Sequence, residues 1–171
     1  MNPSNQSAMR ATHHRRSSSR ADSLRNAVIR HIPSTIAGIA VRLLLSMTPS
    51  LIHRSATRLP RLQEMLTSGS FVVTVTTLQG GGGQLILRDG YLSFSRSQSE
   101  VPDLTQTWSS AKEALRALTS SDETDLQRAF VAGHLKMGGS FLPVLWLNEA
   151  MKLARGRDSK QVTRFLSRDA A

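Results

Sequence analysis

The sequence predicts an α+β fold, in which a five-stranded, mostly antiparallel sheet is covered by helices and preceded by an amphipathic helical leader. Apolar residues recur at helical spacing before residue 50, β-branched alternation begins at Phe71, and helical spacing returns after Ser110. A block of strands between helical blocks is typical of an antiparallel sheet with helices over one face.

The positive charge is concentrated at the start of the chain. Residues 1–60 hold nine Arg and one acid, a net charge of +8, whereas residues 61–171 contribute +2 to the total of +10. Residues 1–21 are polar, rich in Ser and Arg and without periodicity, which predicts a disordered basic tail. An organelle transit peptide has a similar composition. A basic front attracts the phosphates of anionic lipids or of nucleic acid.

The residue types exclude several kinds of site. The chain has no Cys, so it lacks disulfides, thiolate metal ligands and a Cys nucleophile. Its five His are scattered, and none pairs with another as in H-E-x-x-H. We find no G-x-S-x-G nucleophile elbow and no carboxylate pair in an apolar setting. We therefore expect no enzymatic activity, no metal and no cofactor.

Residues 22–60 form the expected leader. Asp22 or Ser23 can cap a short first helix, and Pro33 can begin a second. We expect Pro49 to end the second helix, because proline interrupts helical hydrogen bonding. The second helix carries an amphipathic apolar stripe made of Ile36, Ile39, Ala40, Leu43, Leu44 and Met47.

The leader suits a surface contact better than a membrane span. Two prolines and Arg42 cut the apolar segment, and a span needs roughly 20 mostly apolar residues. An apolar stripe with Arg nearby is typical of a helix that lies on a membrane or on a partner, although a helix packed on its own core has the same stripe. The expected contact residues are Arg30, Ile36, Ile39, Arg42, Leu43 and Met47.

Residues 61–155 contain the expected sheet. A short helix from Leu59 to Leu66 precedes it, and Asp89-Gly90 is a strong signal for a tight turn between two strands. The expected strands cover 71–78, 84–88, 91–95, 103–108 and the short segment 134–137.

Three helices are expected within and after the strands. Ser110 and Glu113 form a capping box at the start of one, and Ser140 can cap the last, which is apolar nearly all round at its start. The acids at 122–125 fit helix capping better than a metal site. These helices cover 110–118, 122–130 and 140–154, and a polar tail follows at 156–171.

The stretch GHLKMGGS at 133–140 differs by one residue from the phosphate loop G-x-x-x-x-G-K-[ST]. A phosphate loop follows a buried strand and precedes a helix, whereas this stretch follows a helix and itself contains a strand pattern. Gly139 stands where the phosphate-binding Lys would be. The glycines at 80–83 join two strands and offer no helix N-terminus. We therefore reject nucleotide binding at both places.

The same stretch resembles the closing motif of the sterol carrier protein 2 (SCP2) family, in which a helix leads through a strand between glycines to a helix that closes a lipid pocket. The segments LILRDG at 85–90 and DLTQT at 103–107 resemble two strands of that family, so the resemblance covers roughly residues 65–154. The leader, with RHIP at 30–33, is similar to that of bacterial SCP2-like accessory factors of ubiquinone biosynthesis. The matching closing residues are Phe130, Gly133, Leu135, Met137, Gly138 and Leu145.

The resemblance implies non-catalytic binding or carriage of a lipid or isoprenoid in an apolar pocket. It implies either an accessory factor of ubiquinone biosynthesis at the membrane surface or a general sterol or fatty-acyl carrier. We expect a cytoplasmic protein, peripheral on the inner membrane, with an anionic membrane surface and ubiquinone biosynthesis enzymes as partners. Ordinary core packing would explain each apolar residue singly. The expected lining residues are Leu87, Leu92, Phe94, Trp108, Phe130, Met137, Phe141 and Leu145.

Two other functions fit parts of the sequence. The Arg-rich arm suits a nucleic-acid-binding protein, but the chain has only eight aromatic residues and no recognised nucleic-acid motif, which disfavours that reading. A scaffold subunit would use the apolar helix at 34–48 to pack on another protein.

Overall fold

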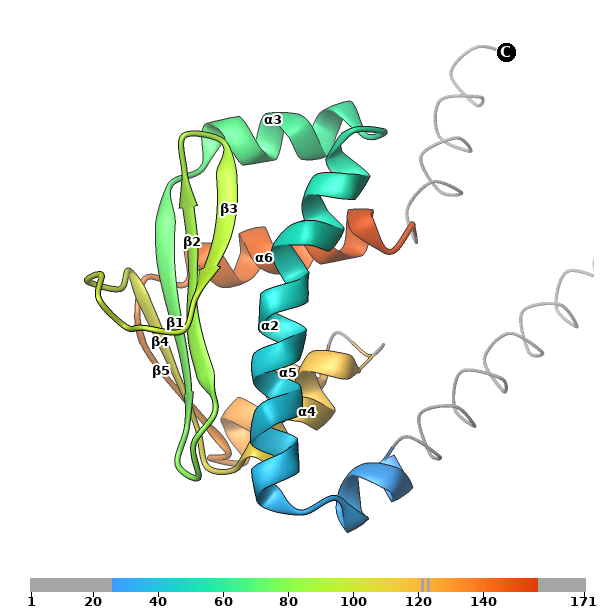
Figure 1. The fold of residues 1–171 in the computed structure, drawn as a ribbon, viewed down its shortest axis with the longest axis vertical. Coiled ribbons are helices and arrows are strands. Elements are labelled where there is room, and N and C mark those ends of the chain that lie inside the picture. Colours follow the sequence, from blue (N-terminus) through green and yellow to red (C-terminus); the bar gives the residue numbers. More distant parts are fainter. Residues whose placement is uncertain (1–25, 121, 123, 157–171) are drawn as a thin grey trace, which may run out of the picture.

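The computed structural model has two layers, with the sheet on one side and the helices on the other (Figure 1). It describes residues 26–120, 122 and 124–156, so the expected basic tail at 1–21 and nearly all of the polar tail at 156–171 lie outside the described residues. Residues 26–31 are helical. The elements that follow are α2 (Ser34–Ala56), α3 (Pro60–Ser68), β1 (Phe71–Thr77), β2 (Gly82–Arg88), β3 (Tyr91–Ser95), β4 (Leu104–Trp108), α4 (Ala111–Thr119), α5 (Asp125–Val131), β5 (Leu135–Gly139) and α6 (Leu142–Ala154).

The sheet has five strands in the order β3-β2-β1-β4-β5. The first three form the expected antiparallel meander, β5 pairs antiparallel with β4, and β4 pairs parallel with β1. The predicted α+β class and mostly antiparallel sheet are therefore confirmed, and the one parallel pair makes the sheet mixed. The connection from β3 to β4 crosses the face away from the helices, where Gln84 of β2 bonds to the backbone of Glu100.

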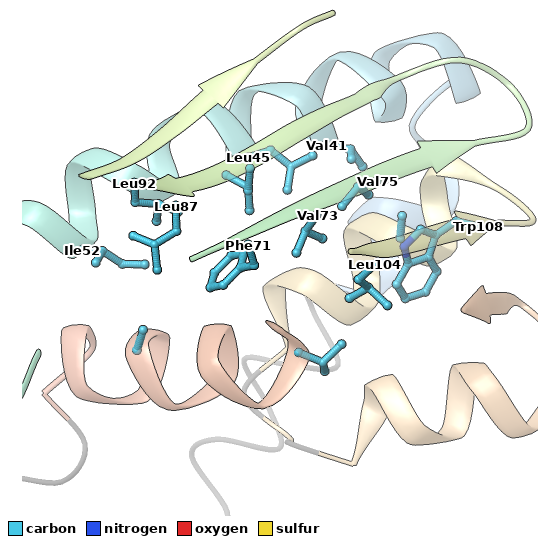
Figure 2. Close-up of a cluster of buried hydrophobic side chains, with 14 of the residues drawn as sticks. Val41, Leu45, Ile52, Phe71, Val73, Val75, Leu87, Leu92, Leu104 and Trp108 are labelled. Carbon is cyan, nitrogen blue, oxygen red and sulfur yellow. The ribbon is translucent and has the colours of Figure 1, made fainter. Parts of the chain in front are cut away.

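Alternating side chains of the strands face the helices and form the core (Figure 2). Phe71, Val73 and Val75 of β1 project toward the helical layer because successive strand residues point to opposite faces. Complete burial of an aliphatic side chain contributes about 1.5–3 kcal/mol, so this face fixes the register of the sheet. Helix α2, which the sequence assigns to the leader, adds Val41, Leu45 and Ile52 to the same core.

The sequence predicted that this helix ends at Pro49, but α2 continues to Ala56. A proline inside a helix removes one backbone donor and costs about 3 kcal/mol. Here the buried face runs on past the proline, since Ile52 and Ala56 pack in the core. The hydroxyl of Thr48 also donates to the carbonyl of Leu44 at 3.0 Å. The packing of α2 against the sheet therefore offsets the free energy that the helix loses at Pro49.

The full length of α2 removes one reason for rejecting a membrane span. With 23 residues and a mean hydropathy of 1.6 in its most apolar window, α2 is long and apolar enough to cross a membrane by length and composition alone. In this fold, however, 33% of that window is buried. The helix contacts β2, β3, α4 and α6, so it serves as a core helix laid along the sheet.

The glycine-rich turn between β1 and β2 allows α2 to approach closely. A Cβ added to Gly38 would lie 2.5 Å from the carbonyl oxygen of Gly80, which no side chain tolerates. Gly81, with φ of 110°, lies against the same point of α2. These glycines therefore serve a contact between backbones, in agreement with the rejection of a phosphate site there.

Strand β5 occupies the stretch that differs by one residue from a phosphate loop. It pairs with β4 from Trp108↔Leu135 to Leu104↔Gly139, so the chain is extended where a nucleotide loop would wrap a phosphate. One half of the predicted capping box of α4 is present, because the Ser110 hydroxyl accepts a hydrogen bond from the Glu113 backbone N–H at 3.1 Å, whereas the Glu113 carboxylate pairs with Arg116 at 2.7 Å.

Candidate functional site

A pocket of about 440 Å³ lies between the sheet and helices α2, α4, α5 and α6. Its floor consists of buried apolar side chains of the sheet, Val73, Val75 and Leu85, and Leu44 and Leu45 of α2 lie above them. Small-molecule sites measure roughly 300–1,000 Å³ and are mostly apolar, so the size and lining suit a small apolar ligand.

The outer helices provide the walls and a polar rim. Leu126 of α5 and Val144 of α6 extend the apolar wall, whereas Gln127, Asn148 and Arg155 line the pocket from exposed positions. The pocket therefore opens to solvent at its rim and is apolar at its base.

Helix α6 is anchored to α3 through Trp146, which is outside the pocket lining, and through Glu149, which belongs to it. The Trp146 indole donates to the Met65 carbonyl of α3 at 3.0 Å and packs edge-on against the Phe71 ring, with ring centroids 5.1 Å apart. Arg61 and Glu149 add an ion pair at 2.8 Å between the same two helices. Trp146 is thus part of the structural frame.

The acidic residue at the rim is held by neighbours on α5 and just before it. The hydroxyl and the backbone N–H of Thr124 donate to the Asp122 carboxylate at 2.7 and 2.9 Å, and Arg128 lies 2.9 Å from it. These bonds, and the positive charge of Arg128, hold the pKa of Asp122 below its ordinary value. Helix α5 begins at Asp125 and has no side-chain hydrogen bond at its N-cap, so the expected capping by these acids is wrong, whereas Asp125 in the first turn fits the expected compensation of the helix dipole.

Among the described residues, no group of three or more His, Asp or Glu side chains lies close enough to hold a metal ion. The His134 ring lies 3.4 Å from the Ser109 hydroxyl, at the junction of β4 with α4.

The pocket has a different lining from the one expected. Leu145 is the one expected residue that lines it, 54% exposed at the rim. Leu87, Leu92 and Trp108 are completely buried in the core, Phe94 and Met137 pack partly buried against it, and Phe130 and Phe141 are half-exposed outside the lining.

The difference between the expected lining and the lining of this pocket has a physical reason. Alternation along a strand identifies the side chains that face the helices, but not where the helices leave a gap. Leu87 and Leu92 lie on the same side as Ile52 of α2, which fills that end of the sheet (Figure 2). Val73 and Val75 lie farther along β1, under the gap that α2 and α6 leave. The alternation along the strand marks these two valines as residues that face the helices, but it marks the other apolar residues of that face equally.

The expected contact residues of α2 remain at the surface. Ile36, Ile39, Leu43 and Met47 are between 52% and 66% exposed, on the side of α2 opposite its buried face. Arg30 and Arg42 are exposed as well, although the Arg42 guanidinium also donates to the carbonyl of Gly82 at 3.4 Å. A different set of α2 side chains packs on the core, so the helix has a buried face and a separate exposed face, and contact of the exposed face with a membrane or a partner stays a prediction.

No family model and no curated protein matches the chain. Comparison with solved structures does give matches. Several structural neighbours are described as SCP2 domains, at low sequence identity and with TM-scores below 0.5.

Three neighbours are similar over most of their own length. One described as the UbiJ-SCP2 ubiquinone synthesis protein is 18% identical with a TM-score of 0.48, over 66% of this chain and 94% of that chain. Sterol carrier protein 2 from Yarrowia lipolytica is 15% identical with a TM-score of 0.49, over 68% and 93%. Sterol carrier protein domain 2 of Helicoverpa armigera is 18% identical with a TM-score of 0.44, over 64% and 85%.

An enzyme contains a similar fold as well. A sec-alkylsulfatase from Pseudomonas sp. is 19% identical with a TM-score of 0.40, over 53% of this chain and 14% of the sulfatase.

Proposed function

We propose that the chain binds and carries a small apolar molecule in the pocket between the sheet and α6, without catalysis. The supporting observation is the hollow itself, about 440 Å³ over the apolar floor of Val73, Val75 and Leu85. Each CH₂ group that leaves water for such surroundings gains about 0.8 kcal/mol. A chain of about ten carbons would gain about 8 kcal/mol before the entropy of binding is subtracted.

Within this function, the ligand that we propose is an isoprenoid or a similar lipid, held by an accessory factor of ubiquinone biosynthesis. The support is the resemblance of the leader to those factors, and one structural neighbour is described as a ubiquinone synthesis protein. General sterol or fatty-acyl carriage is the second candidate, since other neighbours are described as sterol carrier proteins.

We also propose that the exposed face of α2 docks on an anionic membrane, at the cytoplasmic side of the inner membrane. Ile36, Ile39, Leu43 and Met47 form an exposed apolar line, and Arg54 follows Met47 on the same side two turns later. An apolar line with flanking Arg residues binds a surface of anionic lipid through burial and charge together. Leu44 lines the pocket one residue from Leu43, so docking would bring the pocket to the lipid.

Organic extraction of the purified protein, followed by mass spectrometry, tests the carrier function. The native protein is expected to release an apolar molecule in an amount nearly equimolar with the protein. Ala117→Trp fills the pocket from α4 and should remove that molecule, whereas Ala132→Trp, the same change at an exposed site outside the lining, should retain it. Native protein that is empty and takes up no fluorescent lipid would overturn the proposal.

A further inference from the structure

Gln106 is a buried polar side chain of the pocket lining that makes no side-chain hydrogen bond with the described residues. Gln106 is 5% exposed, lies on β4 between the apolar residues Leu104 and Trp108 on the same strand face, and lines the pocket. Its backbone carbonyl accepts a hydrogen bond from Thr76. Its side-chain amide has no hydrogen-bond partner among the described residues.

A second buried glutamine shows what a satisfied amide looks like in this sheet. Gln84, on the opposite face, donates to the Thr74 hydroxyl at 3.0 Å and to the Glu100 carbonyl at 2.8 Å, and accepts from the Glu100 backbone at 3.3 Å. Gln106 makes none of these contacts, although it is nearly as buried. The amide atoms of Gln106 are not among the completely buried unpaired atoms of the described residues, so they are accessible in the pocket to a ligand or to water.

The other polar side chains of the inner lining are already paired. The Thr48 hydroxyl donates to the Leu44 carbonyl at 3.0 Å, and the Ser120 hydroxyl donates to the Asp125 carboxylate at 2.5 Å. Gln106 is therefore the buried lining group that is free to bond to a ligand.

We propose that Gln106 orients the ligand by pairing with a neutral oxygen group, an alcohol or a ketone, at the inner end of an otherwise apolar molecule. This inference rests on the proposed carrier function. The amide suits both groups, because its NH₂ donates to a carbonyl and its oxygen accepts from a hydroxyl.

A carboxylate does not suit the inner end of the pocket. A buried carboxylate needs a cation or several donors. Of the cationic residues of the lining, Lys152 is on the outer helix α6 and Arg155 directly follows that helix; Arg155 is exposed and donates to the Ser120 carbonyl. A fatty acid would therefore place its carboxylate at the rim and its tail at Gln106, the reverse of the orientation proposed for an alcohol.

Equilibrium dialysis of the full chain with radiolabelled decanol, decane and decanoate tests this orientation. Gln106→Leu is expected to lower the ratio of decanol affinity to decane affinity about tenfold, the effect of losing one buried hydrogen bond. The ratio of decanoate affinity to decane affinity should change less than about twofold. Gln106→Met, which keeps the side-chain length, should reproduce both results, and Gln63→Leu, at an exposed site of α3, should leave both ratios unchanged.

Three results would overturn the inference, and each of them refutes a different part of it. An unchanged decanol ratio in folded Gln106→Leu and Gln106→Met would refute the role of Gln106 while leaving the carrier function intact. An equal fall for decanol and decanoate would refute the preference for a neutral group. Native protein that binds neither decane nor decanol would refute the proposed function itself.

Discussion

The Trp146 indole donates a hydrogen bond to the backbone carbonyl of Met65 at 3.0 Å, and this bond ties α6 to α3. The same ring packs against Phe71 at the start of β1. Helix α6 is thus supported on one side, while Val144 and Leu145 line the pocket from the other. Trp146, which anchors α6, is therefore outside the pocket lining.

Loss of this anchor should lower stability. Trp146→Phe removes the hydrogen bond and is expected to lower the free energy of unfolding by about 1–2 kcal/mol, and Trp146→Ala by about 3–5 kcal/mol, because a large half-buried ring is lost. Urea unfolding measures both. Leu142→Ala, at an exposed position of the same helix, should change it by less than about 0.5 kcal/mol. Equal effects of Trp146→Ala and Leu142→Ala would contradict this role.

The contact between α2 and the glycine-rich turn makes a counterintuitive prediction. Gly→Ala inside a helix ordinarily stabilises by about 1 kcal/mol. At Gly38 the new Cβ would lie 2.5 Å from the Gly80 carbonyl oxygen, so Gly38→Ala is expected to destabilise by about 1–3 kcal/mol. Thermal unfolding measures the stability of Gly38→Ala and of the control Ser50→Ala, a substitution at an exposed site of α2. A stabilised Gly38→Ala would show that α2 does not approach the turn this closely.

The membrane proposal predicts a selective loss of lipid binding. Leu43→Asp places a charge in the exposed apolar line of α2 and should weaken binding to anionic vesicles at least about tenfold without loss of stability. Val101→Asp makes the same change at an exposed apolar residue on the opposite face of the sheet and should bind as before. Vesicle flotation measures both. Binding that is equally weakened by the two changes, or unaffected by Leu43→Asp, would exclude docking through α2.

The Asp122 carboxylate gives a pH prediction. Its pKa in the folded chain is below the ordinary value of 3.8, chiefly because the Thr124 hydroxyl donates to it. A lowered folded-state pKa means that the carboxylate stabilises the fold above the unfolded-state pKa and loses that contribution as the pH falls through the folded-state pKa. The effect is confined to acid solution and is small, since the group is exposed and screened.

Thr124→Val should raise the pKa of Asp122 toward its ordinary value, because the hydroxyl donor is lost. An NMR titration of the carboxyl carbon of Asp122 measures the change. An unaltered pKa would show that Thr124 does not hold this carboxylate.

The sequence predicted those features that depend on local spacing. The strand starting at Phe71, the Ser110 cap and the turn at Asp89-Gly90 follow from β-branched runs, cap chemistry and turn residues, and each has a local cause. The end of α2 was predicted wrongly because the effect of Pro49 is local, whereas the packing of Ile52 that outweighs it is tertiary.

The site could be predicted only in part. Alternation places Leu87 and Val75 on the same face, and nothing in the sequence tells which of them lies under a helix and which under a gap. Gln106 did carry a usable signal, since it is a polar residue between Leu104 and Trp108 on the core face of a strand. Such a residue is either paired within the core or available to a ligand, and that distinction required the hydrogen bonds of the structure.

Photolabelling with a long-chain alcohol that carries a diazirine in its chain tests most directly whether this pocket takes up an apolar ligand. The account predicts cross-links to the lining residues Leu45, Val75 and Val144, identified by mass spectrometry of the digested protein, and their loss in Ala117→Trp. Cross-links confined to the outer face of α2, or unchanged by Ala117→Trp, would contradict it.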